Sequence, residues 1–194
     1  MARPKFNIKA RQGPLRERYA REPDSTTVRL EVRSGRSDLT DPLHCAVEPA
    51  SVPGVTWRSG AHPAVGGEGD APCSADLLLG ALAACQEITI RMVAANMGID
   101  LEELEVEVDG DWDPRGTLAM GREFPVGLKA IRCRTRVVIG EEETGDRVER
   151  LLRSSERYCV VLSTLRAGVP VESTFQLTSA CRADAQPTPP VAGK

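Results

Sequence analysis

The chain has 194 residues, with 25 Lys and Arg against 28 Asp and Glu, and 41% of its residues are hydrophobic. These values are typical of a globular domain and exclude a wholly disordered, collagen-like or fibrous protein. Three Phe, two Trp and two Tyr are too few for a platform that stacks single-stranded bases. The acidic excess also argues against binding to a nucleic-acid backbone.

The N-terminal segment differs in charge from the rest of the chain, because residues 1–24 carry seven basic and three acidic side chains. Such an arm can bind nucleic acid, but it more often packs on an acidic surface or a partner subunit, and we expect the latter. The segment has no apolar core of a secretory signal. The longest apolar run, residues 77–85, is too short to cross a bilayer, so we expect a cytoplasmic protein with no membrane contact.

Two helices are predicted from apolar residues that recur at steps of three and four. The first begins with Ser74 as N-cap and ends at Gly98, and its first half is apolar on nearly every side, which is typical of a buried helix. The second begins at a capping box formed by Asp146 and Glu149 and continues to Gly168.

Strands are predicted where apolar and polar residues alternate. The predicted strands are residues 26–33, 44–48, 103–108, 130–139 and 169–177. The Gly- and Pro-rich residues 60–72 indicate an extended loop, and the proline-rich residues 181–194 a disordered tail. The order of elements predicts an α+β domain with two central helices packed on sheet.

Two of the six cysteines, Cys85 and Cys159, fall on the apolar faces of the two predicted helices. Packed helices can bring two Cα atoms to about 5.5 Å, the separation that a disulfide needs. Cysteine is also a common inert core residue, so spacing alone leaves both interpretations open. With no C-x-x-C pair and only two histidines, we expect no metal site.

Two motifs of the first half of the chain are AHPAVGGEGD at residues 61–70 and CSADLLLGALAAC at residues 73–85. Further motifs are ERYCVVLSTL at residues 156–165, and QGPLRERY and RGTL near residues 12 and 115. Together they resemble the motifs of the OsmC family, the osmotically inducible and organic hydroperoxide resistance proteins. The resemblance covers roughly residues 10–178.

The resemblance implies an OsmC-like α+β fold, with antiparallel sheets wrapped around two long central helices in an intertwined homodimer. The predicted organisation is a basic arm at 1–25, an OsmC-like domain at 26–180 and a tail at 181–194. The implied activity is a cofactor-free, cysteine-based peroxidase that reduces organic hydroperoxides or hydrogen peroxide. Cys85 would attack the peroxide, Cys159 would resolve the sulfenic acid as a disulfide, and an external dithiol would restore both thiols.

This chemistry requires a thiolate, whereas a free thiol has a pKa of about 8.5 and burial raises it. Cys85 lies beyond the first turn of its helix, so we expect a nearby arginine. Ser34-Gly35-Arg36 resembles the Gly-Gly-Arg turn of the family, which makes Arg36 the candidate; the competitors are Arg29, Arg33 and Arg58.

The chain departs from the family where Asn-Pro-Glu normally precedes the first helix, because Asp76 stands near the place of the glutamate. Asp76 would orient the arginine, or would be simply a charge at the helix N-terminus. This departure motivates an alternative function, a non-catalytic OsmC-like dimer that binds an apolar small molecule at its interface. A Cys–His hydrolase is disfavoured because neither histidine lies in a motif suited to a base for Cys85. His62 and Cys73 are further candidates, each with a simpler local role.

Overall fold

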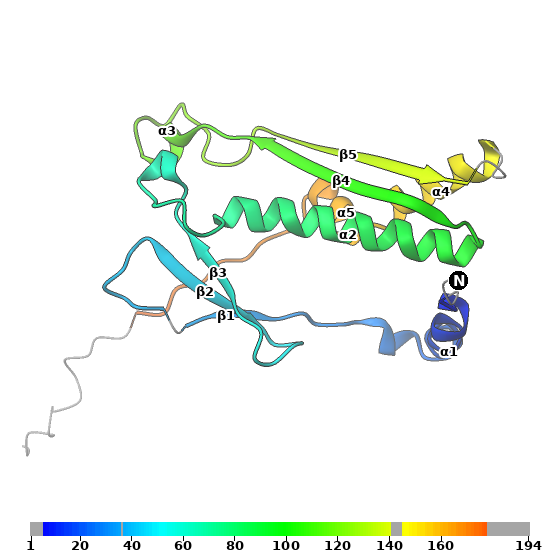
Figure 1. Ribbon diagram of the computed structural model, residues 1–194. Helices are drawn as coiled ribbons and strands as arrows, with labels where there is room; N and C mark the ends of the chain where they lie inside the picture. The colour runs from blue at the N-terminus through cyan, green and yellow to red at the C-terminus, as the bar shows by residue number, and fades with distance from the viewer. Residues whose placement is uncertain (1–5, 36, 141–144, 178–194) are drawn as a thin grey trace, which may run out of the picture.

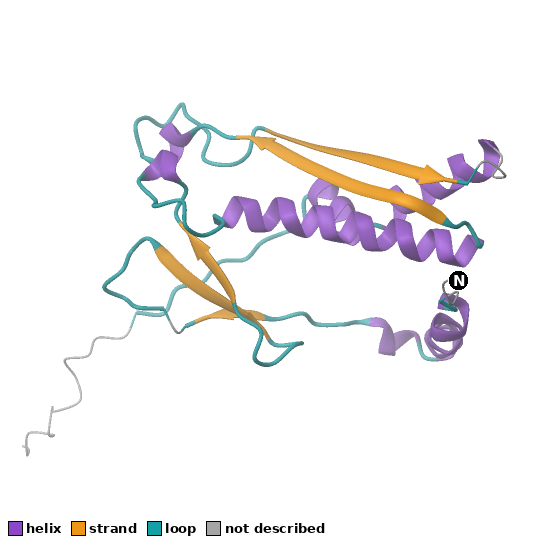
Figure 2. Ribbon diagram, in the orientation of Figure 1, coloured by secondary structure: helices purple, strands orange, loops and turns teal. Residues whose placement is uncertain are grey.

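The computed structural model describes residues 6–35, 37–140 and 145–177. It is a mixed structure in which two antiparallel sheets are arranged around one long helix (Figures 1 and 2). The α+β class predicted from the sequence is therefore confirmed. Arg36 and the predicted tail at 181–194 lie outside the described residues.

The long helix α2 (Ser74–Met97) is the central element. Its N-cap is Cys73 rather than the predicted Ser74: the Cys73 Sγ accepts a hydrogen bond from the Asp76 N–H, and the Asp76 carboxylate accepts one from the Cys73 N–H at 2.8 Å. The predicted end at Gly98 is confirmed, and this residue has a φ of +72°, which glycine adopts without strain.

By length and composition alone, α2 is long and apolar enough to cross a membrane. The apolar run at residues 77–85 covers only part of this helix. In the structure it lies against β4, α4 and α5. Near its C-terminal end, a small core of Ala94, Ile99 and Leu151 joins it to α4, and Leu101 of β4 and Ile139 of β5 pack against this core. Only part of the apolar surface of α2 is buried in the described chain.

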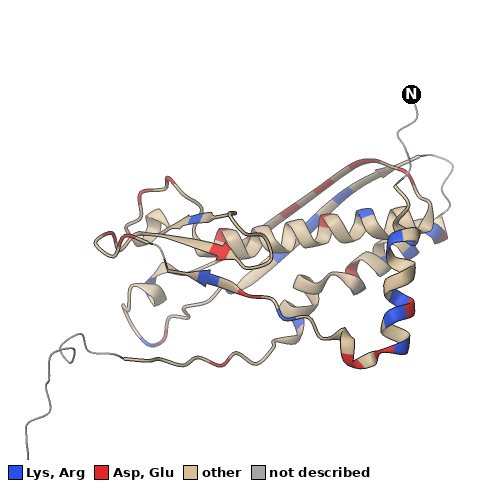
Figure 3. Ribbon diagram, turned by 90° about the horizontal axis from the view of Figure 1, so that it is seen from below, with Lys and Arg blue, Asp and Glu red and all other residues tan. Residues whose placement is uncertain are grey.

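A two-stranded sheet covers one side of α2 (Figure 1). Its strands are β4 (Leu101–Asp111) and β5 (Ala130–Ile139), which confirms the strands predicted at 103–108 and 130–139. Acidic side chains on β4 form exposed ion pairs with arginines on β5, and Figure 3 shows these charges along the two strands. The connection between the strands contains the short helix α3 (Pro114–Thr117).

The second sheet contains β1 (Val32–Ser34), β2 (His44–Pro49) and β3 (Trp57–Gly60) in that order. The strand predicted at 44–48 is confirmed. The strand predicted at 26–33 is largely wrong, since β1 begins only at Val32 and the preceding apolar side chains of Val28 and Leu30 are exposed. Alternating apolar and polar residues form a strand only where a neighbouring strand is available for backbone hydrogen bonds.

The basic N-terminal segment forms α1 (Ile8–Arg21), followed by a 3-10 turn, η1 (Pro23–Thr26). Figure 3 shows the concentration of basic residues on this helix. The helix contacts α2: Ile8 is buried, and the Gln12 amide lies 3.9 Å from the Met92 sulfur. Within the described residues, the arm therefore packs on its own chain.

The predicted second helix is interrupted at Cys159. The structure has α4 (Gly145–Tyr158) and α5 (Val160–Ala167), with Cys159 between them in an extended conformation, φ −73° and ψ 108°. The prediction of one continuous second helix is therefore wrong, and the prediction of two long central helices stays a prediction. The apolar spacing continues across the break, so the sequence pattern does not reveal the break. Val160 and Val161, which follow the break, are β-branched and favour helix only weakly.

The strand predicted at 169–177 is also wrong, because this segment has no regular secondary structure. Its apolar side chains point to solvent: Val171, Phe175 and Leu177 are 87%, 94% and 101% exposed. The alternating pattern is present, but the segment pairs with no strand in the described part of the chain. It would need an edge supplied from elsewhere.

The loop at 60–72 precedes α2 and contains the 3-10 turn η2 (Pro63–Val65). Glycine is required at both Gly66 and Gly67 of this loop, for two different reasons. Gly66 has a φ of +93°, and a Cβ on Gly67 would lie 1.7 Å from the backbone oxygen of Ala61. The Gly-Gly pair is therefore required by the positive φ of the first glycine and by the close approach of another backbone segment to the second.

An ion-pair network fastens this loop to β2. The His44 ring bonds to Asp70 through Nε2 and to Asp41 through Nδ1, each at 2.8 Å, and Arg58 pairs with Asp70 at 2.7 Å. The two carboxylates raise the pKa of His44 above its ordinary value. Although Glu68 also lies close enough to complete a set of metal-ligand atoms, both ring nitrogens of His44 are already hydrogen-bonded. The cluster is an ion-pair network.

Candidate active site

The thiols of Cys85 and Cys159 are neighbours, close enough for each to shift the pKa of the other. Cys85 is in the middle of α2, and Cys159 is the fully buried residue at the break between α4 and α5. Helix α2 packs against both of these helices, and this packing joins cysteines that are far apart in the sequence. Both are free thiols in this structure.

The N-terminus of α5 is directed at Cys85. The backbone N–H groups of Val160 and Val161 lie close enough to the Cys85 thiol to lower its pKa. These are the first two residues of the helix, where N–H groups have no acceptor within the helix and carry the positive end of its dipole. The break at Cys159 therefore supplies donors that a continuous helix would have used internally.

The surroundings shift the pKa values of the two cysteines in opposite directions. Burial raises the pKa of Cys85, but hydrogen bonds from the Val161 N–H, the Cys159 thiol and the Val160 N–H together bring it below its ordinary value. Burial raises the pKa of Cys159, and the neighbouring Cys85 raises it further. Cys85 is thus favoured as the thiolate and Cys159 as the thiol that donates to it.

Thr89, one turn after Cys85 on α2, is a further polar contact. Its buried hydroxyl donates to the Cys85 backbone oxygen at 2.7 Å, and it also contacts the Cys85 thiol, lowering the pKa. The leading favourable contributions to a Cys85 thiolate are therefore all neutral hydrogen-bond donors.

The arginine expected beside Cys85 was assigned to Arg36, which lies outside the described residues, and its role stays a prediction. Two of its competitors are paired elsewhere: Arg33 bonds to Glu31 at 2.6 Å, and Arg58 to Asp70. The third, Arg29, is exposed.

Asp76 occupies the capping box of α2 with Cys73, nine residues before Cys85. A separation of nine residues corresponds to about 13 Å along a helix, so the two side chains do not meet within one chain. The structure thus gives both Asp76 and Cys73 a local capping role, and any action of Asp76 on Cys85 would require an intermediary.

The two histidines are likewise engaged away from the cysteines. His62 accepts a hydrogen bond from the Ala64 N–H at 3.0 Å and makes an edge contact with Trp112. His44 belongs to the network with Asp41 and Asp70. The structure thus offers no support for a Cys–His hydrolase.

Sequence reasoning did not identify Thr89 or the N–H groups of Val160 and Val161. Thr89 could have been found, since a hydroxyl four residues after a cysteine lies on the same helix face. The backbone donors have no side-chain signature, and they depend on a helix break that the apolar spacing conceals.

The family model of OsmC-like proteins matches residues 67–174, which is more than half of the chain and includes both cysteines. This chain belongs to the OsmC-like family. The resemblance noted in the sequence motifs is thereby confirmed.

Solved OsmC-like structures share the fold. An OsmC-like protein from Mycoplasma pneumoniae has a TM-score of 0.57 and 14% identity over 74% of this chain and 91% of that one. An organic hydroperoxide resistance protein OsmC from Legionella pneumophila has a TM-score of 0.52 and 17% identity over 73% and 91%. A third, an organic hydroperoxide resistance protein from Elizabethkingia anophelis, has a TM-score of 0.54 and 12% identity over 74% and 91%. Among curated protein sequences, none matches this OsmC-like chain.

Proposed function

We propose that this OsmC-like protein is a thiol-dependent peroxidase that reduces organic hydroperoxides or hydrogen peroxide. The observation that carries the proposal is the proximity of two thiols whose pKa values shift in opposite directions, that of Cys85 down and that of Cys159 up. A peroxidase of this type needs one nucleophilic thiolate and one reserve thiol within bonding reach.

In the first step, the Cys85 thiolate attacks the terminal oxygen of the peroxide. A sulfur–oxygen bond forms and the oxygen–oxygen bond breaks, so that sulfur is oxidised and the peroxide is reduced. The departing alkoxide or hydroxide takes up a proton and leaves as alcohol or water, and Cys85 remains as the sulfenic acid. The N–H groups of Val160 and Val161 would stabilise the thiolate before the attack.

In the second step, the Cys159 sulfur attacks the sulfenic sulfur, a disulfide forms and water leaves. An external dithiol then transfers two electrons and two protons by thiol–disulfide exchange, and both cysteines return to thiols. The proximity of the two thiols supports a second step with little rearrangement of the chain. The names of the Legionella and Elizabethkingia proteins, both organic hydroperoxide resistance proteins, support this choice of substrate.

We further propose that the chain works as a homodimer. Apolar side chains remain exposed along α2 itself: Leu78 at 41%, Ile88 at 53% and Met92 at 38%. The segment at 169–177 also leaves alternating apolar side chains in solvent. A second copy would bury both surfaces. Sedimentation equilibrium of the full chain should give twice the monomer mass, whereas a monomer at micromolar concentration would contradict this part of the proposal.

The peroxidase proposal is tested with the reduced full chain and tert-butyl hydroperoxide. Titration should consume two thiols per chain, and peptide mass mapping should find Cys85 joined to Cys159. Cys85→Ser should lose peroxide consumption. Cys159→Ser should consume one equivalent of peroxide and stop at the sulfenic acid, which a dimedone adduct would report.

Cys45→Ser is the matched control, because Cys45 is an exposed residue of β2 outside the site, and it should react like the parent. Undiminished peroxide consumption by Cys85→Ser would refute the proposal. So would a parent protein that loses no thiols, which would favour the non-catalytic alternative.

A further inference from the structure

A groove of about 520 Å³ lies between the last turns of α4 and the helix α5, which contact each other on either side of the break at Cys159. Its volume is within the range of sites that hold small molecules. Neither Cys85 nor Cys159 lines it, so it is separate from the dithiol. Its polar side chains come from both helices, with one leucine beside them: Arg153, Glu156, Arg157, Ser163, Arg166 and Leu162.

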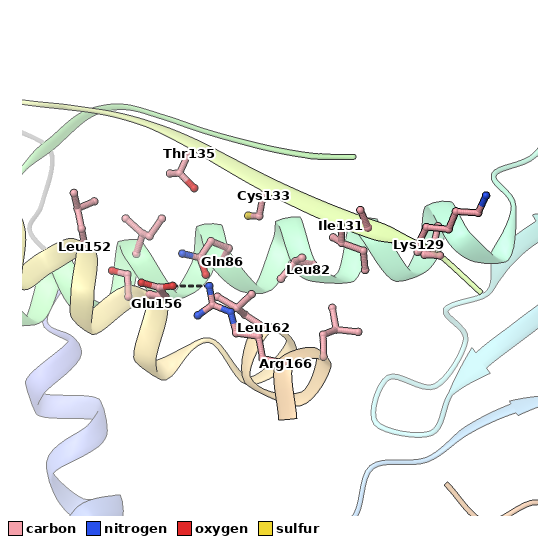
Figure 4. Close-up of a pocket in the computed structure, with 15 residues that line it drawn as sticks. Leu82, Gln86, Lys129, Ile131, Cys133, Thr135, Leu152, Glu156, Leu162 and Arg166 are labelled. Carbon is pink, nitrogen blue, oxygen red and sulfur yellow. Dashed lines mark ion pairs between the residues drawn. The ribbon is translucent and has the colours of Figure 1, made fainter. Parts of the chain in front are cut away.

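The groove has a surplus of positive charge, because three arginines line it against one glutamate. Glu156 pairs with Arg166 at 2.6 Å, and Figure 4 shows this ion pair between α4 and α5, beside Leu162. The surplus therefore consists of two guanidinium groups, those of Arg153 and Arg157.

No carboxylate holds either of these two guanidinium groups firmly. Arg157 forms no ion pair with any described residue, and its guanidinium lies 5.7 Å from the centre of the Tyr158 ring. Arg153 pairs with Glu149 at 3.2 Å, but both side chains of that pair are mostly exposed, and such a pair on a helix surface contributes little free energy. By contrast, each arginine of β5 reaches two carboxylates of β4.

Charge and donor geometry together select a phosphate dianion. A guanidinium presents its N–H donors in a planar fork that matches phosphate oxygens two at a time, and each such bond is charge-assisted. Two positive charges balance the charge of about −2 that a phosphomonoester carries at neutral pH, whereas a carboxylate would balance only one of them. The Ser163 hydroxyl, which bonds to no other described residue, adds a neutral donor.

We propose that this groove binds a phosphate dianion between Arg153, Arg157 and Ser163, with the aliphatic part of a small phosphomonoester against Leu162. Free phosphate offers the same anion without the apolar part, and the test separates these two sources. The proposal does not depend on the peroxidase chemistry, since it needs neither Cys85 nor Cys159, so the two proposals can fail separately.

The test compares n-butyl phosphate with butyl methyl phosphate, a diester that carries one negative charge instead of two. Isothermal titration calorimetry on the reduced full chain measures binding at low ionic strength, where exposed charges are little screened. At about pH 7.5 we expect roughly three- to tenfold tighter binding of the monoester. This preference should disappear at about pH 5, because the second pKa of a phosphomonoester is about 6.

Inorganic phosphate is the third probe, and it distinguishes the source of the anion. Weaker binding of inorganic phosphate than of butyl phosphate assigns the groove to an organic phosphomonoester. Equal binding of the two assigns it to free phosphate.

Three variants sharpen the test, with thermal melting as the check that each folds. Arg157→Gln removes one of the two surplus guanidinium groups and should weaken binding of butyl phosphate roughly three- to tenfold. Arg122→Gln is the matched control and should bind like the parent, because Arg122 is an exposed arginine of the connection between β4 and β5 that does not line the groove. Glu156→Gln removes the competing carboxylate and frees Arg166, so it should bind more tightly than the parent.

The proposal is overturned if butyl phosphate does not bind, or if the monoester and the diester bind equally at about pH 7.5. It is also overturned if Arg157→Gln and Arg122→Gln bind butyl phosphate equally, or if Glu156→Gln fails to strengthen binding.

Discussion

Cys85 lies beside Cys159, and both the Cys159 thiol and the backbone N–H groups that follow it directly in the chain lower the pKa of Cys85. Cys159 therefore affects Cys85 in two ways. It provides the second thiol, and the helix break at Cys159 leaves the N–H groups of Val160 and Val161 without acceptors inside a helix. The position of the second cysteine and the acidity of the first are consequences of the same local backbone conformation.

The contribution of the helix N-terminus can be isolated with Val160→Pro. Proline is well accepted at the first position of a helix, and Cys159 already has the extended conformation that proline imposes on the residue before it. The substitution removes one N–H donor to Cys85 and should raise the pKa of Cys85. We expect roughly three- to thirtyfold slower alkylation of Cys85 at neutral pH, measured by timed iodoacetamide labelling.

Val160→Ala is the matched control, because it shortens the side chain and keeps the N–H. It should label at the parental rate. Equal rates for the proline and alanine variants would remove the helix N-terminus from the explanation.

Thr89 is predicted to position and polarise the Cys85 thiol. Thr89→Val keeps the shape of the side chain but removes the hydroxyl that lies near both the carbonyl and the thiol of Cys85. The pH profile of Cys85 alkylation should move to higher pH, with roughly a two- to tenfold lower rate at neutral pH. Thr89→Ser should restore the profile. A shift that serine leaves uncorrected would indicate a packing effect instead.

Arg36 is predicted to add a positive charge to a site whose described donors are neutral. If its guanidinium approaches Cys85, Arg36→Ala should raise the pKa of Cys85, and peroxide consumption should then need a higher pH to reach its plateau. The sign follows because the thiolate is the reactive form and a cation favours it. Arg33→Ala is a suitable control, since Arg33 is paired with Glu31. An unchanged pH profile would mean that the neutral donors suffice.

The sequence correctly predicted those elements whose residue pattern depends only on neighbours along the chain. The ends of β5 and the C-cap of α2 at Gly98 follow from alternation and from glycine chemistry, and both are confirmed. The choice of Cys85 and Cys159 as a pair follows from their positions on apolar helix faces and from family resemblance, and the structure brings the two close enough to shift each other's pKa.

The errors arose where a distant contact decides the conformation. The pattern at 169–177 is that of a strand, but a strand also needs a partner strand, and this segment pairs with none in the described part of the chain. The break at Cys159 lies within a continuous apolar pattern, so only the packing of α4 and α5 against α2 reveals it. Backbone donors such as those of Val160 and Val161 leave no trace in the identity of side chains.

The ion-pair network of His44 predicts a pH-dependent stability. Hydrogen bonds to Asp70 and Asp41 raise the pKa of His44, so the charged ring is favoured in the folded state. The stabilisation is fully present below the unfolded pKa of about 6.5, and it is lost as the pH rises through the higher folded pKa. His44→Gln should therefore lower the melting temperature more at about pH 6 than at about pH 9, as measured by differential scanning calorimetry.

Glu48→Gln, a change of charge elsewhere on β2, is the control and should change the melting temperature by the same amount at the two pH values. The same thermal shift for His44→Gln at both pH values would mean that the ring holds the loop at 60–72 by packing rather than by its charge.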